Sequence, residues 1–357
     1  MEHKLELTPV NEWGFFTLPK PMIIAGPCSA ETEEQVMETA KGLCDLGIHV
    51  FRAGIWKPRT HPGSFEGVGV PGLKWMQRVK RELGMFTCTE VACEKHVFEC
   101  IKHDVDMVWI GARTSANPFL MQEIADALQD TDIPVLVKNP VNPDIDLWIG
   151  ALERLSRAGV HKLGVIHRGF SSNGKLKYRN DPGWNLAVEF RTRYPELPFF
   201  ADPSHMGGSR DYILELSQRA LDLGLDGLMI ESHCNPGCAL SDAAQQLTPE
   251  GLKDMLGKIV VRETYSESSD FKERLAQLRA QIDVLDENIL YTLKQRMDVS
   301  RAIGQCKREN NVAIVQASRW DKVLESVIRR GGEYGLSEDF MKAVFNAIHD
   351  ASVAAQK

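Results

Sequence analysis

Short apolar runs alternate with helix-length segments between residues 22 and 262. The eight runs are Met22 to Ala25, Ile48 to Ala53, Met85 to Val91, Met107 to Gly111, Pro134 to Val137, Leu163 to Ile166, Pro198 to Ala201 and Gly227 to Ile230. The segments between them have apolar residues three or four positions apart, and they include Glu33 to Leu46, Glu94 to Lys102, Pro118 to Leu128, Ile145 to Ala158 and Tyr212 to Leu223. Eight strands alternating with helices predict an α/β fold, a parallel (β/α)8 barrel of the TIM type. A doubly wound open sheet is the rival fold, but no Gly-x-Gly-x-x-Gly follows the first run.

The pattern changes after residue 262. Residues 263–270 are polar and lack strand or helix periodicity, so we expect an interdomain linker there. Beyond it, apolar residues recur at spacings of four and three, at Phe271, Leu275, Leu278, Ile282, Leu285, Ile289 and Leu293. They predict one helix of about 35 to 40 residues, followed by two shorter helices over Val323 to Arg330 and Ser337 to Gln356.

Three helices cannot by themselves cover so long an apolar stripe, so the stripe predicts a partner chain. A plain dimerisation coiled coil is disfavoured because the heptads are irregular and few charges pair across them. We therefore expect a barrel domain in residues 1–262 and a small all-helical domain, shared between the two chains of a homodimer, in residues 271–357.

Composition narrows the class of protein. The chain has 357 residues, 43% of them hydrophobic, and a net charge of −7, which argues against nucleic acid as a partner. No run approaches the ~18 consecutive apolar residues of a membrane span, and the start, Met-Glu-His-Lys-Leu-Glu, lacks the order of a signal peptide. We expect a cytoplasmic protein that has no membrane partner. Eight cysteines without zinc-finger spacing are expected to be mostly buried, reduced thiols.

Potential metal ligands stand at the predicted ends of three strands. Glu231 ends the eighth apolar run, and a loop containing Pro and Gly then leads to Asp242. Such a carboxylate pair on its own usually faces water or caps a helix. Cys28 after the first run and His205 after the seventh change that interpretation, because active-site residues of this fold gather where strands end. Thiolate, imidazole and two carboxylates suit a divalent first-row metal ion.

Basic residues follow the strands on the same rim. A single arginine there is usually a solvated or ion-paired surface residue, but six basic residues exceed what solubility requires. They are Arg52, Lys57, Arg59, Arg113, Lys138 and Arg168. Arginine grips phosphates and carboxylates through two parallel hydrogen bonds and lysine acts as a point charge. The rim therefore predicts a site for more than one anionic group.

Several stretches on this rim resemble one family. They are Gly-Pro-Cys-Ser, Lys-Pro-Arg-Thr, Gly-Ala-Arg-Thr, Asp-Pro-Ser-His and Ser-Asp-x-x-Gln-Gln. Residues 20–262 are similar through them to short microbial 3-deoxy-D-arabino-heptulosonate 7-phosphate (DAHP) synthases, the transferases that open the shikimate pathway to the aromatic amino acids. One departure is His61 with Gly63, where the family often has Ser and a larger residue.

The resemblance implies roles for the rim residues. Cys28, His205, Glu231 and Asp242 would bind one divalent metal ion, with Mn2+ favoured over Fe2+, Co2+ or Zn2+. Phosphoenolpyruvate would be held by Arg52, Lys57, Arg113, Lys138 and Arg168, and the phosphate of erythrose 4-phosphate by Arg59 and Thr60. Glu90, on the third strand, is the one carboxylate of this rim that is not among the metal ligands. We therefore expect it to orient or deprotonate the water that attacks C2 of phosphoenolpyruvate, or else to pair with Lys57 or Lys138. The sister reaction with arabinose 5-phosphate is the alternative, although the Lys57-Pro58-Arg59-Thr60 stretch favours erythrose 4-phosphate.

Basic residues of the long helix predict a second site. Arg296 and Lys307 are 11 residues apart, about three turns, so they share a face. Arg279 is 17 residues before Arg296, roughly 25 Å along the helix axis, too far to grip the same small ligand. An antiparallel partner chain could bring its own Arg279 to this site, giving two composite sites in a dimer.

Residues 270–357 resemble the all-helical chorismate mutases, isomerases that convert chorismate to prephenate. The matching features are Leu-Arg-x-x-Ile-Asp-x-Leu-Asp, Arg296, Gly304-Gln305-Cys306-Lys307, Ser318-Arg319 and Ser352-x-x-x-Gln356. The resemblance implies that Arg279, Arg296 and Arg319 hold the carboxylates, that Lys307 and Gln356 approach the ether oxygen, and that Ser352 assists binding. After Arg319 the family commonly has Glu, and this chain has Trp320 and then Asp321, which puts the contact to the substrate hydroxyl in doubt.

The two resemblances together predict a bifunctional enzyme with phosphoenolpyruvate, erythrose 4-phosphate and chorismate as substrates. The alternative for the second domain is a mutase-like fold kept as a regulatory ligand sensor and dimeriser. Only about twenty residues precede the first strand, too few for a regulatory domain. We therefore expect allosteric feedback on the synthase from chorismate or prephenate bound to the helical domain.

Overall fold

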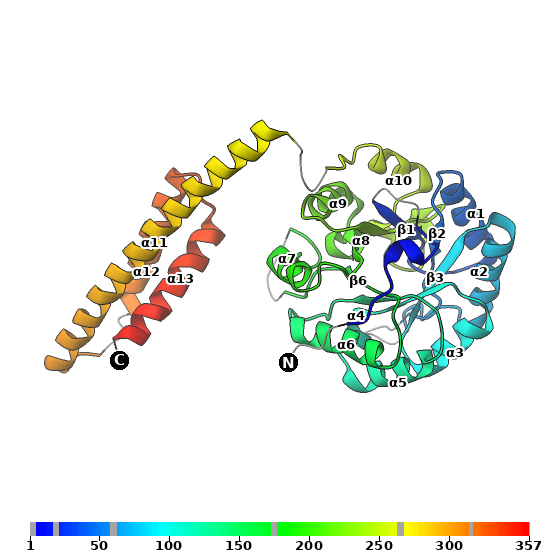
Figure 1. Cartoon of the computed structure of the whole chain (residues 1–357), viewed down its shortest axis with the longest axis horizontal. Helices are drawn as coiled ribbons and strands as arrows, with labels where there is room; N and C mark the ends of the chain where they lie inside the picture. Colours follow the sequence, from blue (N-terminus) through cyan, green and yellow to red (C-terminus); the bar gives the residue numbers. More distant parts are fainter. Residues whose placement is uncertain are drawn as a thin grey trace. The chain divides into compact units, whose positions relative to one another are not determined.

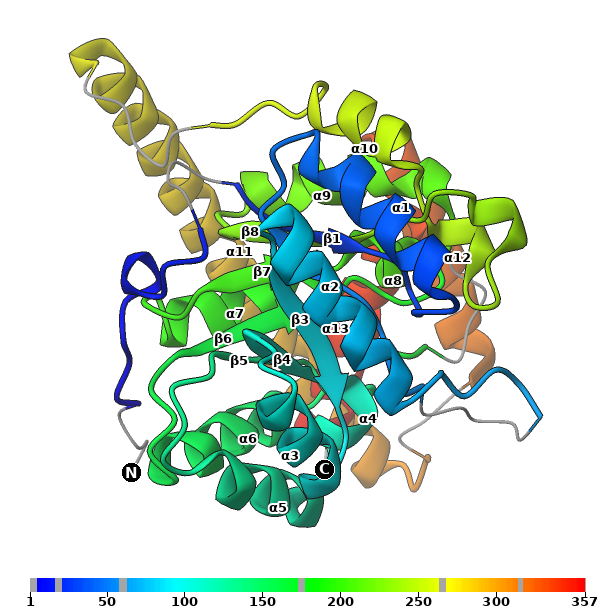
Figure 2. The same cartoon turned by 90° about the vertical axis from the view of Figure 1, so that its right-hand side faces the viewer.

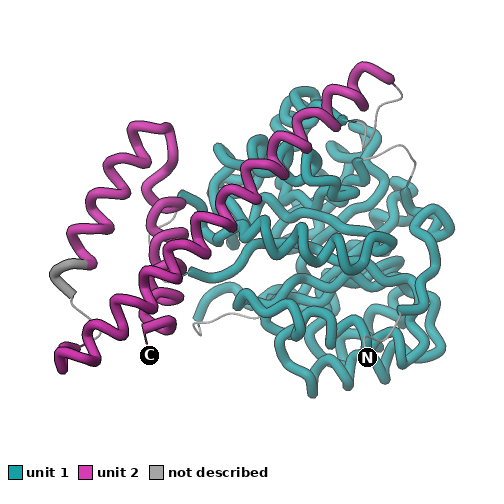
Figure 3. Tube along the Cα trace, turned by 60° about the vertical axis from the view of Figure 1, so that its left-hand side comes forward, with its two compact units in different colours: residues 1–264 teal, residues 265–357 magenta. Residues whose placement is uncertain are grey.

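The computed structural model of the chain describes residues 5–16, 21–57, 63–172, 177–262, 268–313 and 317–356. The chain forms two compact units, Met1–Thr264 and Tyr265–Lys357 (Figure 3). The first unit is a barrel and the second is made of helices. Arg59 and Thr60, proposed for the aldose phosphate, lie outside the described residues, as does the side chain of Arg319.

Eight parallel strands close the barrel in sequence order, which confirms the predicted fold (Figures 1 and 2). They are β1 (Met22–Gly26), β2 (Val50–Arg52), β3 (Phe86–Val91), β4 (Met107–Ile110), β5 (Val135–Lys138), β6 (Leu163–His167), β7 (Phe199–Ala201) and β8 (Gly227–Glu231). β8 pairs with β1 from Met22 opposite Gly227 to Gly26 opposite Glu231. That register brings the ends of the first and last strands together, although about 200 residues of the chain separate them.

Helices surround the strands, as alternation of the two elements requires. The barrel unit contains α1 (Glu33–Cys44), α2 (Val70–Leu83), α3 (Glu94–Lys102), α4 (Ala112–Ser115), α5 (Pro118–Leu128), α6 (Ile145–Arg157), α7 (Trp184–Arg193), α8 (Pro203–Gly207), α9 (Ile213–Asp222), α10 (Pro249–Leu256) and four short 3-10 helices, η1 (Val10–Glu12), η2 (Arg210–Tyr212), η3 (Pro236–Cys238) and η4 (Ala243–Gln245). Side chains that accept backbone N–H groups begin several of them, among them Thr32 before α1 and Asp144 before α6.

Two apolar layers hold the barrel together. One lies between strands and helices and includes Val36, Leu73, Ile124 and Leu152. The other fills the barrel interior with Ile24, Val50, Met107, Trp109, Leu136, Ile166, Phe200 and Met229. Trp13 joins the interior layer, and Phe15 stacks edge-on against Phe86 with ring centroids 4.7 Å apart. The segment before β1 therefore packs against the interior residues.

The second unit consists of α11 (Ser269–Glu309), α12 (Ala317–Glu333) and α13 (Glu338–Ala355). The 41-residue α11 is slightly longer than predicted and continues through Gly304, while α12 extends well beyond the predicted eight residues. Part of the apolar stripe of α11 is exposed within one chain, including Ile282, Leu285 and Ile289, each more than half exposed. None of the helices in the described ranges has the length and apolarity that crossing a membrane requires.

Candidate active sites

The ends of β1 and β8 bring three potential metal ligands together. Ligand atoms of Cys28, Glu231 and Asp242 all lie within 4.8 Å of one another, and the Cys28 thiol donates to Asp242 Oδ2 over 3.3 Å. Close packing requires Gly26 just before Cys28, since a Cβ there would lie 1.9 Å from the backbone oxygen of Arg52. Asp242 adopts a left-handed backbone conformation with φ of 46°, which aspartate tolerates better than most residues.

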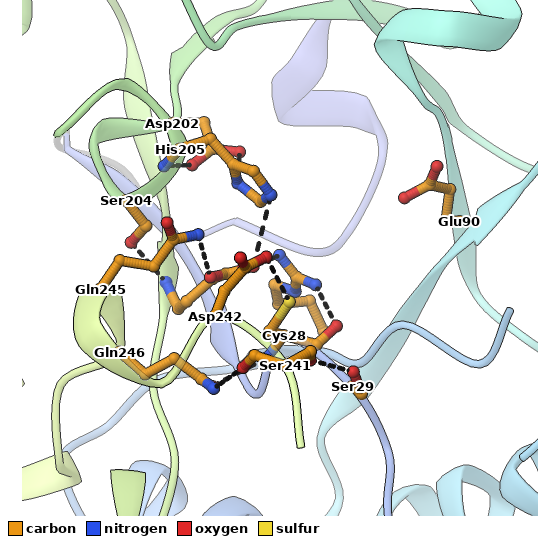
Figure 4. A network of polar contacts seen from close by, with 12 residues as sticks. Cys28, Ser29, Glu90, Asp202, Ser204, His205, Ser241, Asp242, Gln245 and Gln246 are labelled. Atoms are coloured by element: carbon orange, nitrogen blue, oxygen red, sulfur yellow. Dashed lines mark hydrogen bonds and ion pairs between the residues drawn. The ribbon is translucent and has the colours of Figure 1, made fainter. Parts of the chain in front are cut away.

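His205, in the middle of the short α8, faces the same cluster (Figure 4). Its Nε2 lies 3.6 Å from Glu231 Oε1 and its Nδ1 lies 2.8 Å from Asp202 Oδ2. Asp202 also accepts the backbone N–H of His205 over 3.0 Å, so this fully buried carboxylate fixes both the helix start and the imidazole. A carboxylate behind a ligating histidine is the usual means of setting its ring orientation.

Three cations already compensate the cluster. Lys57 donates from Nζ to Cys28 Sγ over 3.1 Å, and Arg52 pairs with Glu231 over 3.3 Å. Arg179, which the sequence analysis did not single out, pairs with Asp242 Oδ1 over 2.9 Å. Arg52 and Glu231 are almost completely buried, so their pairing is little screened by water.

The pKa of the thiol and the pKa values of the carboxylates in this cluster are shifted in opposite directions. Burial raises the pKa of Cys28 to about 12, and the charge of Glu231 adds to this effect. Burial also opposes ionisation of Glu231 and Asp242. Nearby cationic groups together outweigh this effect and lower both pKa values: His205 and Arg52 act on Glu231, and His205 and Arg179 act on Asp242. The carboxylates stay ionised, while the thiol keeps its proton until a cation displaces it.

The residues fit a divalent metal ion on chemical grounds. Sulfur, imidazole nitrogen and carboxylate oxygen are a donor set that first-row metals accept. The donors come from the segment after β1, from α8, from the end of β8 and from the loop before η4. The fold therefore brings close together the residues that the sequence predicts as ligands, and their binding of a metal ion stays a prediction.

The predicted basic residues line the rest of the rim. The Arg52 guanidinium lies over the Trp109 ring, 4.6 Å from its centroid, and Lys138 pairs with Asp202 over 2.6 Å. Arg168 donates to the Asn180 side chain over 3.0 Å. Arg113, on α4, is exposed. Arg52, which pairs with Glu231, and Lys138 are thus engaged by carboxylates, and Arg168 is engaged by a neutral amide.

Glu90 lies apart from the metal cluster in Figure 4. Its Oε2 accepts a hydrogen bond from Trp109 Nε1 over 3.1 Å, and Gly111 leaves room for the carboxylate, because a Cβ there would lie 2.1 Å from Glu90 Oε1. Lys57 and Lys138 donate to Cys28 and Asp202, respectively. The direct ion pair with either lysine, considered from the sequence, is therefore not formed.

Several residues without a role predicted from the sequence support the candidate ligands. Gln245 donates from Nε2 to Glu231 Oε2 over 2.7 Å, and Gln246 Oε1 accepts the backbone N–H of Cys28 over 2.9 Å. Ser204 Oγ accepts the backbone N–H of Glu231 over 3.0 Å. The two glutamines belong to the quoted Ser-Asp-x-x-Gln-Gln stretch, so that motif was the signal that could have identified them.

The helical unit brings four predicted residues to the contact between α11 and α13. Arg296 donates to Ser352 Oγ and to the backbone oxygen of Ile348, the latter over 3.5 Å. Three turns further along α11, Lys307 Nζ lies 3.3 Å from Gln356 Oε1. Both pairs lie along one helix–helix seam, so the predicted shared face of Arg296 and Lys307 exists.

Arg279 and Trp320 are two other described residues of this unit that the sequence singled out. Arg279 is exposed on the first half of α11, well before Arg296 along the helix. Trp320, which stands where the mutase family commonly has Glu, stacks on His349 of α13 with ring centroids 4.0 Å apart. This stacking gives Trp320 a packing role between α12 and α13.

The barrel and its rim define an enzyme that holds anionic substrates beside a cluster suited to a divalent cation. The chain belongs to the DAHP synthetase I family, whose model matches residues 19–266, and residues 278–357 match chorismate mutase type II. It therefore carries a DAHP synthase domain followed by a chorismate mutase domain, which confirms the two families expected from the sequence.

Individual relatives agree with this assignment. A phospho-2-dehydro-3-deoxyheptonate aldolase of Thermotoga maritima is 35% identical over 68% of this chain and 68% of its own length. The crystal structure of a DAHP synthase from Thermotoga maritima matches with a TM-score of 0.61 and 34% identity over 66% of this chain and 67% of that chain. A 2-dehydro-3-deoxyphosphooctonate aldolase of Bordetella pertussis is 26% identical over 70% of this chain and 93% of its length.

Proposed function

We propose that the barrel joins phosphoenolpyruvate to erythrose 4-phosphate and that the helical unit rearranges chorismate to prephenate. The observation that carries the first activity is the cluster of Cys28, Glu231 and Asp242 beside His205, surrounded by the cations of the strand ends. We assign the synthase to residues 1–262, a linker to 263–270 and the mutase to 271–357, and we propose that the chain works in the cytoplasm.

Four residues would hold the metal ion: Cys28, His205, Glu231 and Asp242. When bound, a divalent cation supplies Lewis acidity that polarises the aldehyde oxygen of the sugar phosphate. We propose Mn2+ as the ion, with Fe2+, Co2+ and Zn2+ as alternatives. Lys57 would stabilise the thiolate form of Cys28, because its ammonium group lies 3.1 Å from the sulfur.

The remaining rim residues would fix phosphoenolpyruvate. Its phosphate and carboxylate would be held by Arg52, Lys57, Arg113, Lys138 and Arg168. Fixing C3 of phosphoenolpyruvate against the aldehyde carbon turns a bimolecular encounter into an oriented reaction. Arg59 and Thr60 are proposed to hold the phosphate of erythrose 4-phosphate.

The reaction balances with one water. A bond forms between C3 of phosphoenolpyruvate and the aldehyde carbon, water adds to C2, and the C2–O bond to phosphate breaks to give DAHP and inorganic phosphate. We propose that Glu90 orients this water and accepts its proton. Support for this role is that its carboxylate is held by Trp109, the ring over which the Arg52 guanidinium also lies.

The mutase step needs no nucleophile, because chorismate rearranges in one pericyclic step. We propose that Arg296, Arg319 and the partner subunit's Arg279 bind the two carboxylates, with Ser352 assisting. Lys307 and Gln356 would donate to the ether oxygen as it becomes negative, and their side-chain atoms already lie 3.3 Å apart.

We propose that the helical units pair into a homodimer. The exposed apolar residues of α11, including Ile282, Leu285 and Ile289, support this, since an exposed stripe of this kind usually marks a contact surface. The dimer would complete each mutase site. Binding of chorismate or prephenate in that site would also regulate the synthase allosterically, whether or not regulation is its principal role.

The experiment that tests the synthase measures phosphoenolpyruvate loss and phosphate release with each aldose phosphate. Erythrose 4-phosphate should be consumed and arabinose 5-phosphate should not. The second arm is needed because a 2-dehydro-3-deoxyphosphooctonate aldolase is among the similar proteins. Turnover of arabinose 5-phosphate alone would refute the proposed substrate, and mutase turnover is scored separately by chorismate loss.

A further inference from the structure

A buried amide links the two functional parts of the barrel rim. Asn180, only 7% exposed, stands on the segment that returns from β6 towards α7. Its Nδ2 donates to the backbone oxygen of His205 over 2.6 Å, and its Oδ1 accepts from Arg168 Nη1 over 3.0 Å. The two hydrogen bonds use opposite ends of one amide, so a shift at either end is transmitted to the other.

The backbone around Asn180 is held in place. Its N–H donates to Met206 O over 3.0 Å, and the N–H of Arg179 donates to Gly207 O over 3.2 Å, so the segment pairs with α8. Just after Asn180 in the sequence, the backbone oxygen of Pro182 is hydrogen-bonded to Nε2 of the buried His167 over 2.5 Å. The backbone of Asn180 is therefore fixed in position, which holds its side-chain amide between Arg168 and His205.

A neutral residue suits this position. Arg168 is proposed to bind an anionic substrate, and a carboxylate in place of Asn180 would neutralise part of its charge. An amide oxygen orients the guanidinium and leaves its charge for the substrate. The amide nitrogen meanwhile gives a partly buried backbone carbonyl of α8 a hydrogen-bond donor.

We propose that Asn180 is a positioning residue that couples phosphoenolpyruvate binding at Arg168 to metal binding at His205. This inference rests on the proposed synthase function. When the substrate fixes the Arg168 side chain, the amide holds the first turn of α8, and the His205 imidazole is held where the metal ligands converge. Metal binding has the reciprocal effect on Arg168, as linkage between two sites requires.

The test measures Mn2+ and phosphoenolpyruvate binding to the full chain by calorimetry, each alone and each at saturation of the other. In the unaltered chain each ligand should tighten the other several-fold. Asn180→Ala should reduce this coupling factor to within about twofold of one. It should also weaken Mn2+ binding by roughly tenfold, the lower end of the range expected when a residue that supports a metal ligand is lost. Asn142→Ala is the matched control, because Asn142 accepts from Ser171 in an exposed contact that involves neither Arg168 nor His205, and it should leave the coupling unchanged.

Asn180→Asp guards against loss of folding in the alanine variant. It keeps the side-chain volume and the oxygen facing Arg168, but it has no donor for the backbone oxygen of His205. Coupling should be lost in this variant too. If either folded variant retains the coupling factor of the unaltered chain, the inference is wrong. If the unaltered chain binds neither Mn2+ nor phosphoenolpyruvate, the proposed function fails, and the inference that rests on it fails as well.

Discussion

Gly304 gives the sharpest test of the proposed mutase site. A Cβ at this position would lie 2.7 Å from both the Cα and the backbone oxygen of Gln356. Carbon atoms in contact settle about 3.5 to 4.0 Å apart, so Gly304→Ala should separate α11 from the end of α13 by roughly 1 Å. Gln356 faces Lys307 across this seam, and a misplacement of about 1 Å can slow a reaction ~100-fold.

We therefore expect Gly304→Ala to lower the mutase kcat by roughly two orders of magnitude. A weaker helix cannot explain such a loss, because alanine is favoured over glycine within a helix by about 0.5 to 1 kcal/mol. The assay follows chorismate loss in the full chain, with far-ultraviolet circular dichroism as the check on helix content. Synthase activity in the same preparation should stay within about twofold, because Gly304 belongs to the other compact unit.

Gly332→Ala is the matched control. Gly332 lies in α12 with nothing within 4 Å of the position that a Cβ would occupy, so the same chemical change meets no obstacle there. Mutase activity should be unchanged and the Tm equal or slightly higher. Near-normal mutase kcat in Gly304→Ala would refute the argument, since the end of α13 could then move without affecting the reaction.

Three further predictions concern the metal, the dimer and feedback. Cys28→Ser should abolish synthase activity and leave mutase turnover within a few fold; near-normal synthase activity would remove Cys28 from the proposed ligands. Arg279→Ala and Arg296→Ala chains should each be nearly inactive as mutases, yet regain part of the activity when dissociated and mixed; proven heterodimers without recovery would contradict shared sites. Prephenate should slow the synthase of the whole chain but not of a chain ended near residue 265, and aromatic amino acids should slow neither; an unaffected whole enzyme at saturating prephenate would exclude feedback.

The strands and their order could be predicted because each is a short apolar run and consecutive parallel strands leave few other arrangements. The candidate ligands followed from the same logic, since Cys28, His205 and Glu231 stand where runs end. Asn180 could not be found this way. It lies on a long connection without periodicity, and its partners, Arg168 and His205, become neighbours only when that connection folds back onto α8.

The helical unit shows a different limit of sequence reasoning. Residues 317–322 of α12 precede the apolar run that begins at Val323, so periodicity placed the helix start too late. Trp320 could not be assigned a role, because its stacking partner His349 is on another helix. The packing of Trp13 into the barrel interior was missed for a similar reason, since it lies in a segment that is too short to show a pattern.

The charge compensation around Cys28, Glu231 and Asp242 bears on how the barrel would take up the proposed metal ion. Arg52, Lys57 and Arg179 already balance Glu231 and Asp242, and the thiol of Cys28 stays protonated. Structural zinc domains, in contrast, remain unfolded until the ion arrives. Because the charges of its carboxylates are already balanced, this barrel does not depend on the proposed ion in order to fold, and the ion would bind to a preformed site.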